Sequence, residues 1–327
     1  MDVIAFGSVF LEIVFGHVAA LPEPGQEIFA DEFGISCGGV VTVATAASRD
    51  GARAGLCTWL GDDAGSRLIE EHCRSEGIDL SPAQRHPGRG AGITVVLNFD
   101  GDRAFVTHPP AAWGRPDLGY RLETLRRHRP DWCYLHPGQD ALRFLREARA
   151  LGTRIALDVN REEIVADAEH VLACAALADV FLPNEDELLR LTGAGTFEAA
   201  AAAATWGPAV VVKRGERGAA VLGPEGVTEV SAGLQPVQVR DRTGAGDAFA
   251  GALLSAICRG APIAEAVAAG NAAGSAAVAR LGGVGELDAG GLTSLGLAAA
   301  APALATDGAA EAAVHRAAQT RQRGSHR

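Results

Sequence analysis

One short segment late in the chain constrains the fold and the chemistry more than any other. It reads Asp241-Arg242-Thr243-Gly244-Ala245-Gly246-Asp247, and the alanine-rich apolar run Ala248–Ile257 follows at once. The order predicts a helix whose first backbone N–H groups are free, with glycines that let an anion approach closely. A carboxylate at Asp247 repels phosphate, but it can accept the proton of a hydroxyl that attacks phosphorus. The segment therefore predicts an anion hole beside a base.

The same segment resembles the D-T-x-G-A-G-D signature of the ribokinase-like (PfkB-type) carbohydrate and nucleoside kinases, with Arg242 where Thr is usual. The resemblance implies that Asp247 is the catalytic base. It also implies that the amides of Gly244, Ala245 and Gly246 form the anion hole. Taken alone, the segment could equally be a glycine-rich helix cap, but matches elsewhere in the chain favour the kinase.

Apolar strands alternate with helices in the second half of the chain. Strands are expected at Trp132–His136, Arg154–Val159 and Asp179–Leu182, with helices at Ala141–Leu151 and near Ala166–Ala176. This alternation predicts an α/β fold, a doubly wound and mostly parallel sheet flanked by helices. We expect a ribokinase-like kinase domain at residues 1–292, followed at 293–327 by an Ala/Gly-rich tail that is partly disordered.

A second motif concerns the phosphate donor. The run Pro183-Asn184-Glu185-Asp186-Glu187 matches the family's P-N-x-x-E. Asn184 and Glu187 lie three residues apart at a helix start and can face the same way, and Mg²⁺ prefers oxygen ligands and keeps several waters. We expect these two residues to organise Mg–ATP, Asn184 through water. The alternative is an acidic helix start favoured by the helix dipole.

Further segments resemble the family's nucleotide-side elements. The strand Val210–Lys213 ends in a glycine turn, and Lys213, the only lysine of the chain, or the Gly215 and Gly218 amides are expected at the ATP phosphates. Asn271 resembles an adenine-side contact. The resemblance also implies a monovalent cation, K⁺ in type, held by Asp241 and Thr243 with the run from Ala277 to Gly282.

The acceptor side departs from the family pattern. Glu12 stands in place of an Asp that binds acceptor hydroxyls, although a Glu on an exposed strand face is the alternative. Gly38 and Gly39 retain a Gly-Gly element, but Thr42 replaces its usual Asn. His136 falls where some relatives hold a sugar-binding Glu, and a core histidine is equally consistent with the sequence. Strands within residues 10–36, one of them Ile13–Val18, and within 91–108 would form a β-sheet lid. Arg103 follows an expected hairpin turn at Asp100 and Gly101 and could reach an anionic acceptor, although a solvated turn arginine is the alternative.

Composition narrows the class of protein. A net charge of −11 opposes non-specific nucleic-acid binding, and no apolar run reaches membrane length. The six cysteines include no C-x-x-C pair, as expected for buried thiols in a reducing cytosol. We therefore expect a cytoplasmic protein with no nucleic-acid or membrane partner. A homodimer through the lid sheet is common among members of the family.

Two other enzyme classes have weaker support. No G-x-x-x-x-G-K-[ST] motif is present, which excludes a P-loop kinase. The run Gly34-Ile35-Ser36-Cys37-Gly38 fits the hydrolase pattern G-x-S-x-G, but a polar alternating segment precedes it where that motif needs a buried strand.

These observations favour an ATP-dependent kinase that phosphorylates a hydroxyl of a small sugar. A nucleoside (adenosine-type) kinase is the alternative. A non-catalytic sugar- or nucleotide-binding protein on the same fold is a third reading, motivated by the altered acceptor motifs and opposed by the intact Asp247, Asn184 and Glu187.

Overall fold

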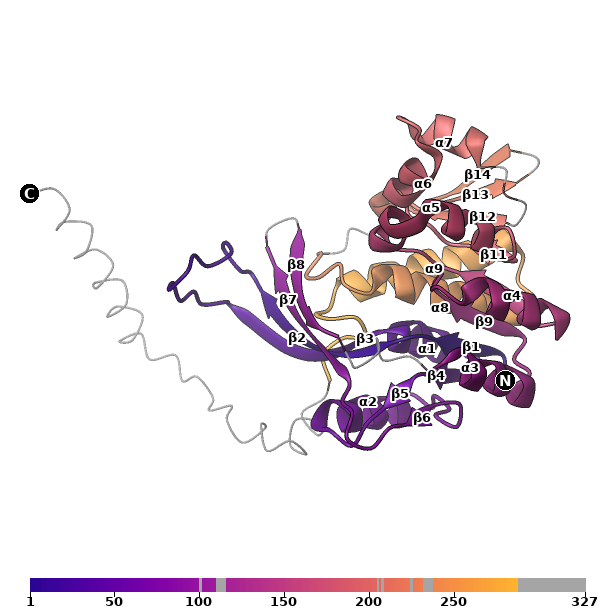
Figure 1. The fold of residues 1–327 in the computed structure, drawn as a ribbon. Coiled ribbons are helices and arrows are strands. Elements are labelled where there is room, and N and C mark those ends of the chain that lie inside the picture. The colour runs from indigo at the N-terminus through magenta and orange to yellow at the C-terminus, as the bar shows by residue number, and fades with distance from the viewer. Residues whose placement is uncertain are drawn as a thin grey trace, which may run out of the picture. The chain divides into compact units, whose positions relative to one another are not determined.

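An eight-stranded sheet lies at the centre of the fold in the computed structural model (Figure 1). The structure describes residues 1–99, 102–109, 116–204, 206, 209–223, 226–231 and 238–287. Residues Met1–Leu287 form one compact unit. The expected tail at 293–327, the domain end at 292 and the turn residues Asp100 and Gly101 lie outside the described residues.

The strand order of the central sheet is β14-β13-β12-β11-β10-β9-β1-β4. Neighbours from β4 to β12 pair in parallel, whereas β13 and β14 pair antiparallel at one edge. The strands are β1 (Val3–Phe6), β4 (Ala54–Cys57), β9 (Trp132–Leu135), β10 (Arg154–Leu157), β11 (Val180–Phe181), β12 (Ala209–Lys213), β13 (Ala219–Gly223) and β14 (Gly226–Val230). The predicted mostly parallel α/β sheet is confirmed.

Helices cover both faces of this sheet, because its strands are apolar on both sides. The helices α1 (Val40–Arg49), α2 (Ala64–Ser75), α8 (Ala245–Cys258) and α9 (Ile263–Val278) contribute to one core cluster. The other cluster takes its helical side chains from α3 (Leu118–His128), α4 (Ala141–Ala150), α5 (Arg161–Ala175), α6 (Glu185–Thr192) and α7 (Phe197–Ala203).

Helix α8 packs closely on α1, and a glycine makes this possible. A methyl group added to Gly251 would lie 2.2 Å from the carbonyl oxygen of Val43. The close approach sets the spacing between α8 and α1, and Asp247 lies in the first turn of α8.

A second sheet of four strands, in the order β3-β2-β7-β8, extends from the central sheet as the lid (Figure 1). Its strands are β2 (Val9–Gly16), β3 (Glu32–Gly39), β7 (Gly92–Asn98) and β8 (Arg103–His108). Strand β2 begins earlier than the strand Ile13–Val18 expected from the sequence, because it continues from β1 with only Gly7 and Ser8 between them. A pair of short strands, β5 (Trp59–Leu60) and β6 (Gln84–Arg85), completes the described strands.

The strand order reverses at β1, which lies between β4 and β9. Ligands of open α/β sheets bind beyond the carboxyl ends of strands at such a point. The residues that follow β1, β9 and β10 therefore define where a site is expected. None of the helices in the described ranges combines the length and apolar character needed to cross a membrane.

Candidate active site

Asp247 lies in the first turn of α8, directly after the glycine segment. Gly244 is the N-cap residue with a φ of 73°, a conformation that favours glycine. A methyl group on Gly244 would also lie 2.6 Å from the Gly283 Cα. The first N–H groups of a helix have no intrahelical acceptor, so this turn presents backbone donors next to the Asp247 carboxylate.

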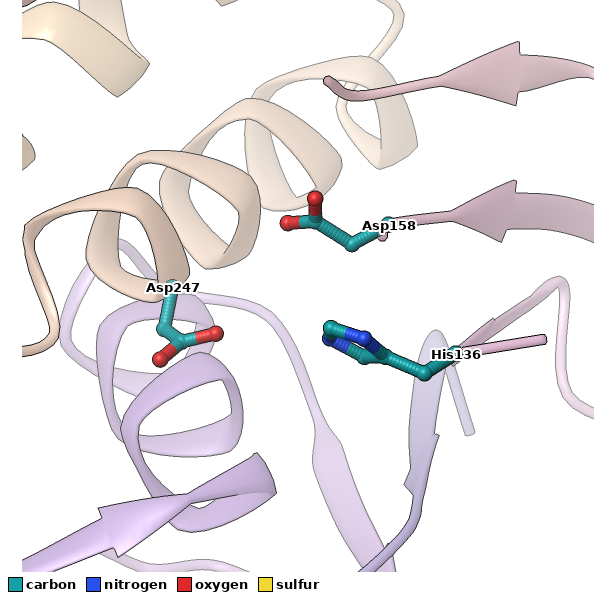
Figure 2. A group of neighbouring side chains, drawn as sticks. All are labelled: His136, Asp158 and Asp247. Atoms are coloured by element: carbon teal, nitrogen blue, oxygen red, sulfur yellow. The ribbon is translucent and has the colours of Figure 1, made fainter. Parts of the chain in front are cut away.

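Asp247 faces the carboxyl ends of β9 and β10 (Figure 2). His136 follows β9, and Asp158 follows β10. One ligand atom from each of these three side chains lies within 4.8 Å of the others. The structure therefore brings together the predicted base, the predicted acceptor contact and the strand-end Asp158.

The Tyr134 hydroxyl lies at the centre of this group. Its oxygen is 3.2 Å from Asp247 Oδ1, 3.1 Å from Asp158 Oδ2 and 3.3 Å from His136 Nε2. Tyr134 is fully buried, and one hydroxyl donates one hydrogen bond at a time. The sequence reasoning missed Tyr134. The available signal was its position on β9 two residues before His136, which places both side chains on one face.

Burial raises the pKa of Asp247 to about 6, and the negative charge of Asp158 acts in the same direction. The charges of His136 and Lys213 and the Tyr134 hydrogen bond oppose this rise. A carboxylate with a pKa near 6 is ionised at neutral pH and remains a better proton acceptor than an ordinary Asp. Burial raises the pKa of Tyr134 well above its usual value, so its hydroxyl stays protonated as a donor.

His136 is a partly exposed strand-end residue, with 31% of its side chain accessible, and not a core histidine. Its Nδ1 lies 3.1 Å from Glu163 Oε2. Burial lowers the pKa of His136, but the Glu163 hydrogen bond and the charges of Glu163, Asp158 and Asp247 outweigh it and raise the pKa to about 9. His136 therefore carries a positive charge at neutral pH, which Glu163 holds in place.

Lys213 forms a buried ion pair with Asp158. Its Nζ lies 2.8 Å from both carboxylate oxygens, and the two side chains are 16% and 4% exposed. Lys213 also borders the predicted anion hole, since a methyl group on Gly246 would lie 3.4 Å from Nζ. The position suits the predicted ATP-phosphate contact, with Asp158 as the residue that holds the ammonium there.

The cluster of Figure 2 has the ligand types of a metal site, but its charges favour a hydrogen-bonded network. Asp158 already has a cation partner in Lys213. A protonated His136 has no free nitrogen lone pair to offer a metal ion.

Glu12 lies at the junction of the lid and the central unit. It is only 6% exposed, so the exposed-strand alternative is wrong. Its Oε2 accepts a 2.8 Å hydrogen bond from the Gly283 backbone, and a methyl group on Gly38 would lie 2.0 Å from its Oε1. Burial raises the pKa of Glu12 to about 7, and Asp241 and Asp247 add to the rise.

The other expected acceptor residues lie close by. Gly39 is the N-cap residue of α1, with a φ of 71°. Thr42 is buried, and its hydroxyl has no hydrogen-bond partner among the described residues. A methyl group on Gly283 would lie 2.6 Å from this hydroxyl, which places Thr42 next to the loop that holds Glu12.

The P-N-x-x-E motif forms a capping box at the start of α6. Asn184 Oδ1 accepts from the Glu187 N–H at 2.8 Å, and Glu187 Oε2 accepts from the Asn184 N–H at 2.7 Å. A structural role is therefore present, through capping hydrogen bonds that neither the Mg–ATP prediction nor the helix-dipole alternative included. The Mg–ATP role of the two residues stays a prediction. The Lys213 N–H bonds to the Pro183 carbonyl at 2.9 Å, so the two donor-side motifs are adjacent.

The remaining nucleotide-side residues lie as follows. Gly215 has a φ of 59° and no atom within 4 Å of an added methyl group, so the turn is open there. Gly218, with a φ of 84°, is buried, and its N–H donates to the Gly215 carbonyl at 3.0 Å. Asn271 uses its Nδ2 to bind the Val230 and Ser231 carbonyls at 3.1 and 3.2 Å. It therefore holds the end of β14, and its adenine contact stays a prediction.

Asp241 joins two loops beside the signature. Its Oδ1 accepts from the Thr243 N–H and its Oδ2 from the Gly282 N–H, both at 2.8 Å. The Thr243 hydroxyl is buried without a partner among the described residues. The two residues expected at a monovalent cation are thus placed beside the loop at residues 280–285.

Comparisons with known proteins agree with this arrangement. Residues 5–289 match the description "pfkB family carbohydrate kinase". Among curated proteins, the cytidine kinase of Thermococcus kodakarensis is 29% identical over 269 residues, covering 79% of this chain and 92% of that protein. The aminoimidazole riboside kinase of Salmonella typhimurium is 28% identical over 274 residues, covering 76% and 84%.

A solved structure gives the same result for the fold. Arabidopsis thaliana ribokinase, complexed with ribose and ATP, superposes with a TM-score of 0.72 and is 26% identical, covering 91% of this chain and 98% of that one.

Proposed function

Because the chain belongs to the pfkB family of carbohydrate kinases, we propose that Asp247 removes the proton of a sugar hydroxyl as that hydroxyl attacks the γ-phosphate of ATP. The protein is an ATP-dependent kinase of this family. The observation that carries the proposal is the place of Asp247, which lies in the first turn of α8 and faces Asp158 and His136 at the carboxyl ends of β10 and β9 (Figure 2).

The residues around Asp247 fit general-base chemistry. A pKa of about 6 keeps the carboxylate ionised at neutral pH, yet basic enough to take a proton in the transition state. The backbone amides at residues 244–246 would stabilise charge on the transferring phosphoryl group. Lys213, held beside Gly246 by Asp158, would add a positive charge at the same place.

Glu187 fits the divalent ion that ATP brings. It is 8% exposed, and burial and the charge of Asp158 raise its pKa to about 7 against the opposing charge of Lys213. The Glu187 carboxylate offers an oxygen ligand of the kind that Mg²⁺ prefers, and the ion, when bound, would neutralise the triphosphate. The Thr243 hydroxyl, which has no hydrogen-bond partner within the described ranges, likewise fits the monovalent cation that the signature implies.

A small sugar is the acceptor that we propose, with a nucleoside as the second candidate. Fructokinases are among the relatives, for example one from Oryza sativa that is 28% identical. The cytidine kinase relative favours the nucleoside alternative. Glu12, His136 and Thr42 can bind the hydroxyl groups of either a ribose or a hexose. Whether the acceptor carries a nucleobase must therefore be tested directly.

The outer face of the lid supports a homodimer. Four apolar side chains on this face are exposed, Phe33 by 57%, Ile93 by 41%, Val106 by 65% and, in part, Phe15. An apolar sheet face of this kind is normally covered. Light scattering on the purified protein tests the proposal, and a monomer at micromolar concentration contradicts it.

The kinase proposal is tested with Mg–ATP and a panel of sugars and nucleosides, measuring ADP and the phosphorylated product. We expect one acceptor class to support turnover and Asp247→Asn to abolish it, while calorimetry shows ATP binding unchanged. ATP binding without any phosphorylated product would instead favour the non-catalytic binding protein. Near-normal turnover of Asp247→Asn would remove Asp247 as the base.

A further inference from the structure

The two donor-side motifs meet through one backbone pair and then part. The Lys213 N–H bonds to the Pro183 carbonyl at 2.9 Å, and Asn184 forms an isolated parallel bridge with Lys213. Beyond this bridge one segment enters α6, and the other makes the turn at residues 215–218. With a single bridge between the two segments, side chains decide how the turn lies relative to α6.

The Glu185 carboxylate holds this turn at two points. Its Oε2 accepts a 2.9 Å hydrogen bond from Arg214 Nε, at the entry to the turn, and a 2.6 Å bond from Arg217 Nη2 within it. Glu185 is the first residue of α6, directly after Asn184 and two residues before Glu187. One carboxylate thus connects the turn to the capping box that contains the predicted Mg²⁺ ligand.

The backbone of Arg214 closes the turn. Its N–H bonds to the Gly218 carbonyl at 2.8 Å, and its carbonyl accepts from the Arg217 N–H at 3.2 Å. A shift of Arg214 would therefore move the whole turn with it.

Two further contacts fix the Arg214 side chain, which is only 8% exposed. Its Nη1 pairs with Glu229 on β14, and its guanidinium carbon lies 3.7 Å from the centre of the Phe197 ring on α7. A planar guanidinium can bind carboxylates at its edge and stack on a ring with its face at the same time. The contacts of Arg214 therefore join α6, α7 and β14 at one point.

Opposite charges are paired at this point. Burial raises the pKa of Glu185, but the hydrogen bonds and charges of Arg214 and Arg217 outweigh it and lower the pKa below its usual value. Burial lowers the pKa of Arg214, and Glu185 and Glu229 together raise it above its usual value. Glu185 and Arg214 are therefore both charged at neutral pH, and the ion pair between them is present.

Lys213 and Arg214 are neighbours in the chain with separate contacts. Lys213 Nζ binds Asp158 beside the predicted anion hole, whereas the side-chain partners of Arg214 named above lie outside the cluster of Figure 2. An effect of Arg214 on the reaction would therefore act through the backbone of the turn.

Resting on the proposed kinase function, we propose that Glu185 and Arg214 are positioning residues for Mg–ATP. The ion pair between them holds the turn at residues 215–218 in a fixed place relative to Glu187 and Lys213. The groups that would bind the phosphates and the Mg²⁺ are then in place before the nucleotide arrives. Such pre-organisation strengthens binding, because less of the site has to be ordered by the ligand.

The test measures ATP binding to the full-length protein by calorimetry with Mg²⁺ present, together with kcat and KM for ATP and for the acceptor. Glu185→Gln keeps the shape of the side chain but removes the charge and one of the two acceptor oxygens, so it holds two guanidinium groups less well. We expect Kd and KM for ATP to rise on the order of tenfold. KM for the acceptor and kcat at saturating ATP should stay near their wild-type values.

Glu229→Gln is the matched control, because it makes the same substitution at the other carboxylate that binds Arg214. Glu229 is 66% exposed and lies on β14 and not on α6, so this variant should bind ATP as the wild type does. The stoichiometry of binding separates positioning from folding. A variant that folds poorly loses binding sites, whereas a misplaced turn raises Kd at unchanged stoichiometry.

Glu185→Gln combined with Arg214→Met tests whether the two residues act through one contact. We expect Arg214→Met alone to weaken ATP binding to a similar degree. The double variant should then bind ATP no more weakly than the weaker of the two single variants.

The outcomes distinguish this inference from the kinase proposal. An unchanged Kd for ATP in Glu185→Gln would overturn the inference and leave the kinase in place. Equal weakening in Glu229→Gln, or effects that multiply in the double variant, would show that the Glu185–Arg214 contact is not what positions the turn, and would also overturn it. A wild type that binds ATP but phosphorylates no acceptor would count against the kinase alone, because the calorimetric comparison still decides the role of Glu185.

Discussion

The hydroxyl oxygen of Tyr134 lies 3.2 Å from Oδ1 of Asp247, and so joins strand β9 to the first turn of α8. The same hydroxyl lies 3.1 Å from Asp158 Oδ2, which Lys213 holds from its other side. Tyr134 is fully buried, so its position is set by packing and not by solvent. We interpret it as a positioning residue that fixes the orientation of the base through a hydrogen bond.

Tyr134→Phe keeps the ring and removes this hydrogen bond. Because the bond lowers the pKa of Asp247, its loss should raise that pKa and move the acidic limb of the kcat profile to higher pH. The expected loss of kcat is greater at pH 6 than at pH 8. The measurement is kcat against pH with saturating substrates.

Tyr120→Phe is the matched control, since its hydroxyl binds the Ala83 carbonyl on a different part of the fold. A uniform loss of kcat at every pH in Tyr134→Phe, or the same shift in Tyr120→Phe, would argue against a role through Asp247.

His136→Gln tests the acceptor contact. His136 carries a positive charge up to a pKa of about 9, and a charged donor contributes about 1.5–3 kcal/mol to a hydrogen bond. We expect KM for the acceptor to rise roughly tenfold or more at pH 7.5, with KM for ATP unchanged. In the wild type this contribution is present below pH 9 and is lost above it. If both KM values are unchanged in the variant, His136 does not bind the acceptor and only forms the hydrogen bond with Glu163.

Glu12→Gln tests a buried carboxyl whose pKa is raised from its usual value to about 7. Between about pH 4.5 and 7 the folded protein holds this proton and the unfolded chain does not. The free energy of unfolding therefore falls as pH rises through this window. Gln keeps an acceptor for the Gly283 N–H and has no charge to bury.

Glu12→Gln should thus be more stable than the wild type above pH 7, on the order of 1–3 kcal/mol, and equal to it near pH 4.5. Chemical denaturation at both pH values measures this difference. KM for the acceptor should rise at the same time, if Glu12 binds its hydroxyls. If the variant is less stable than the wild type at pH 8, the charge of Glu12 is compensated in the folded protein and does not destabilise it.

The fold was predictable because its signals are local. The glycines before α8, the apolar strands and the P-N-x-x-E capping box each act through neighbouring residues, so the sequence contains them directly. The expected lid strand Ile13–Val18 was displaced from the observed Val9–Gly16, because the observed strand includes the charged Glu12, which the sequence left open between burial and exposure.

The polar network was less predictable. Tyr134, Asp158, Lys213 and Asp247 come from four elements spread over more than 100 residues, and only the sheet order brings them together. Tyr134 in an apolar strand reads as an ordinary core residue. The sequence could not decide whether the Glu12 side chain is buried or exposed. The residues that cover it, Gly282 and Gly283, lie about 270 residues later in the chain.

Lys213→Met tests the ion pair that this sheet order creates. It leaves Asp158 as a buried carboxylate, 4% exposed, without its cation, and removing one partner of a buried pair typically costs about 3–5 kcal/mol. We expect a loss of this order in chemical denaturation. Asp158→Asn combined with Lys213→Met should recover part of it, because no unpaired charge remains. KM for ATP should stay raised in the double variant if Lys213 contacts the phosphates. A double variant that recovers both stability and ATP affinity would show that the lysine serves only to neutralise Asp158.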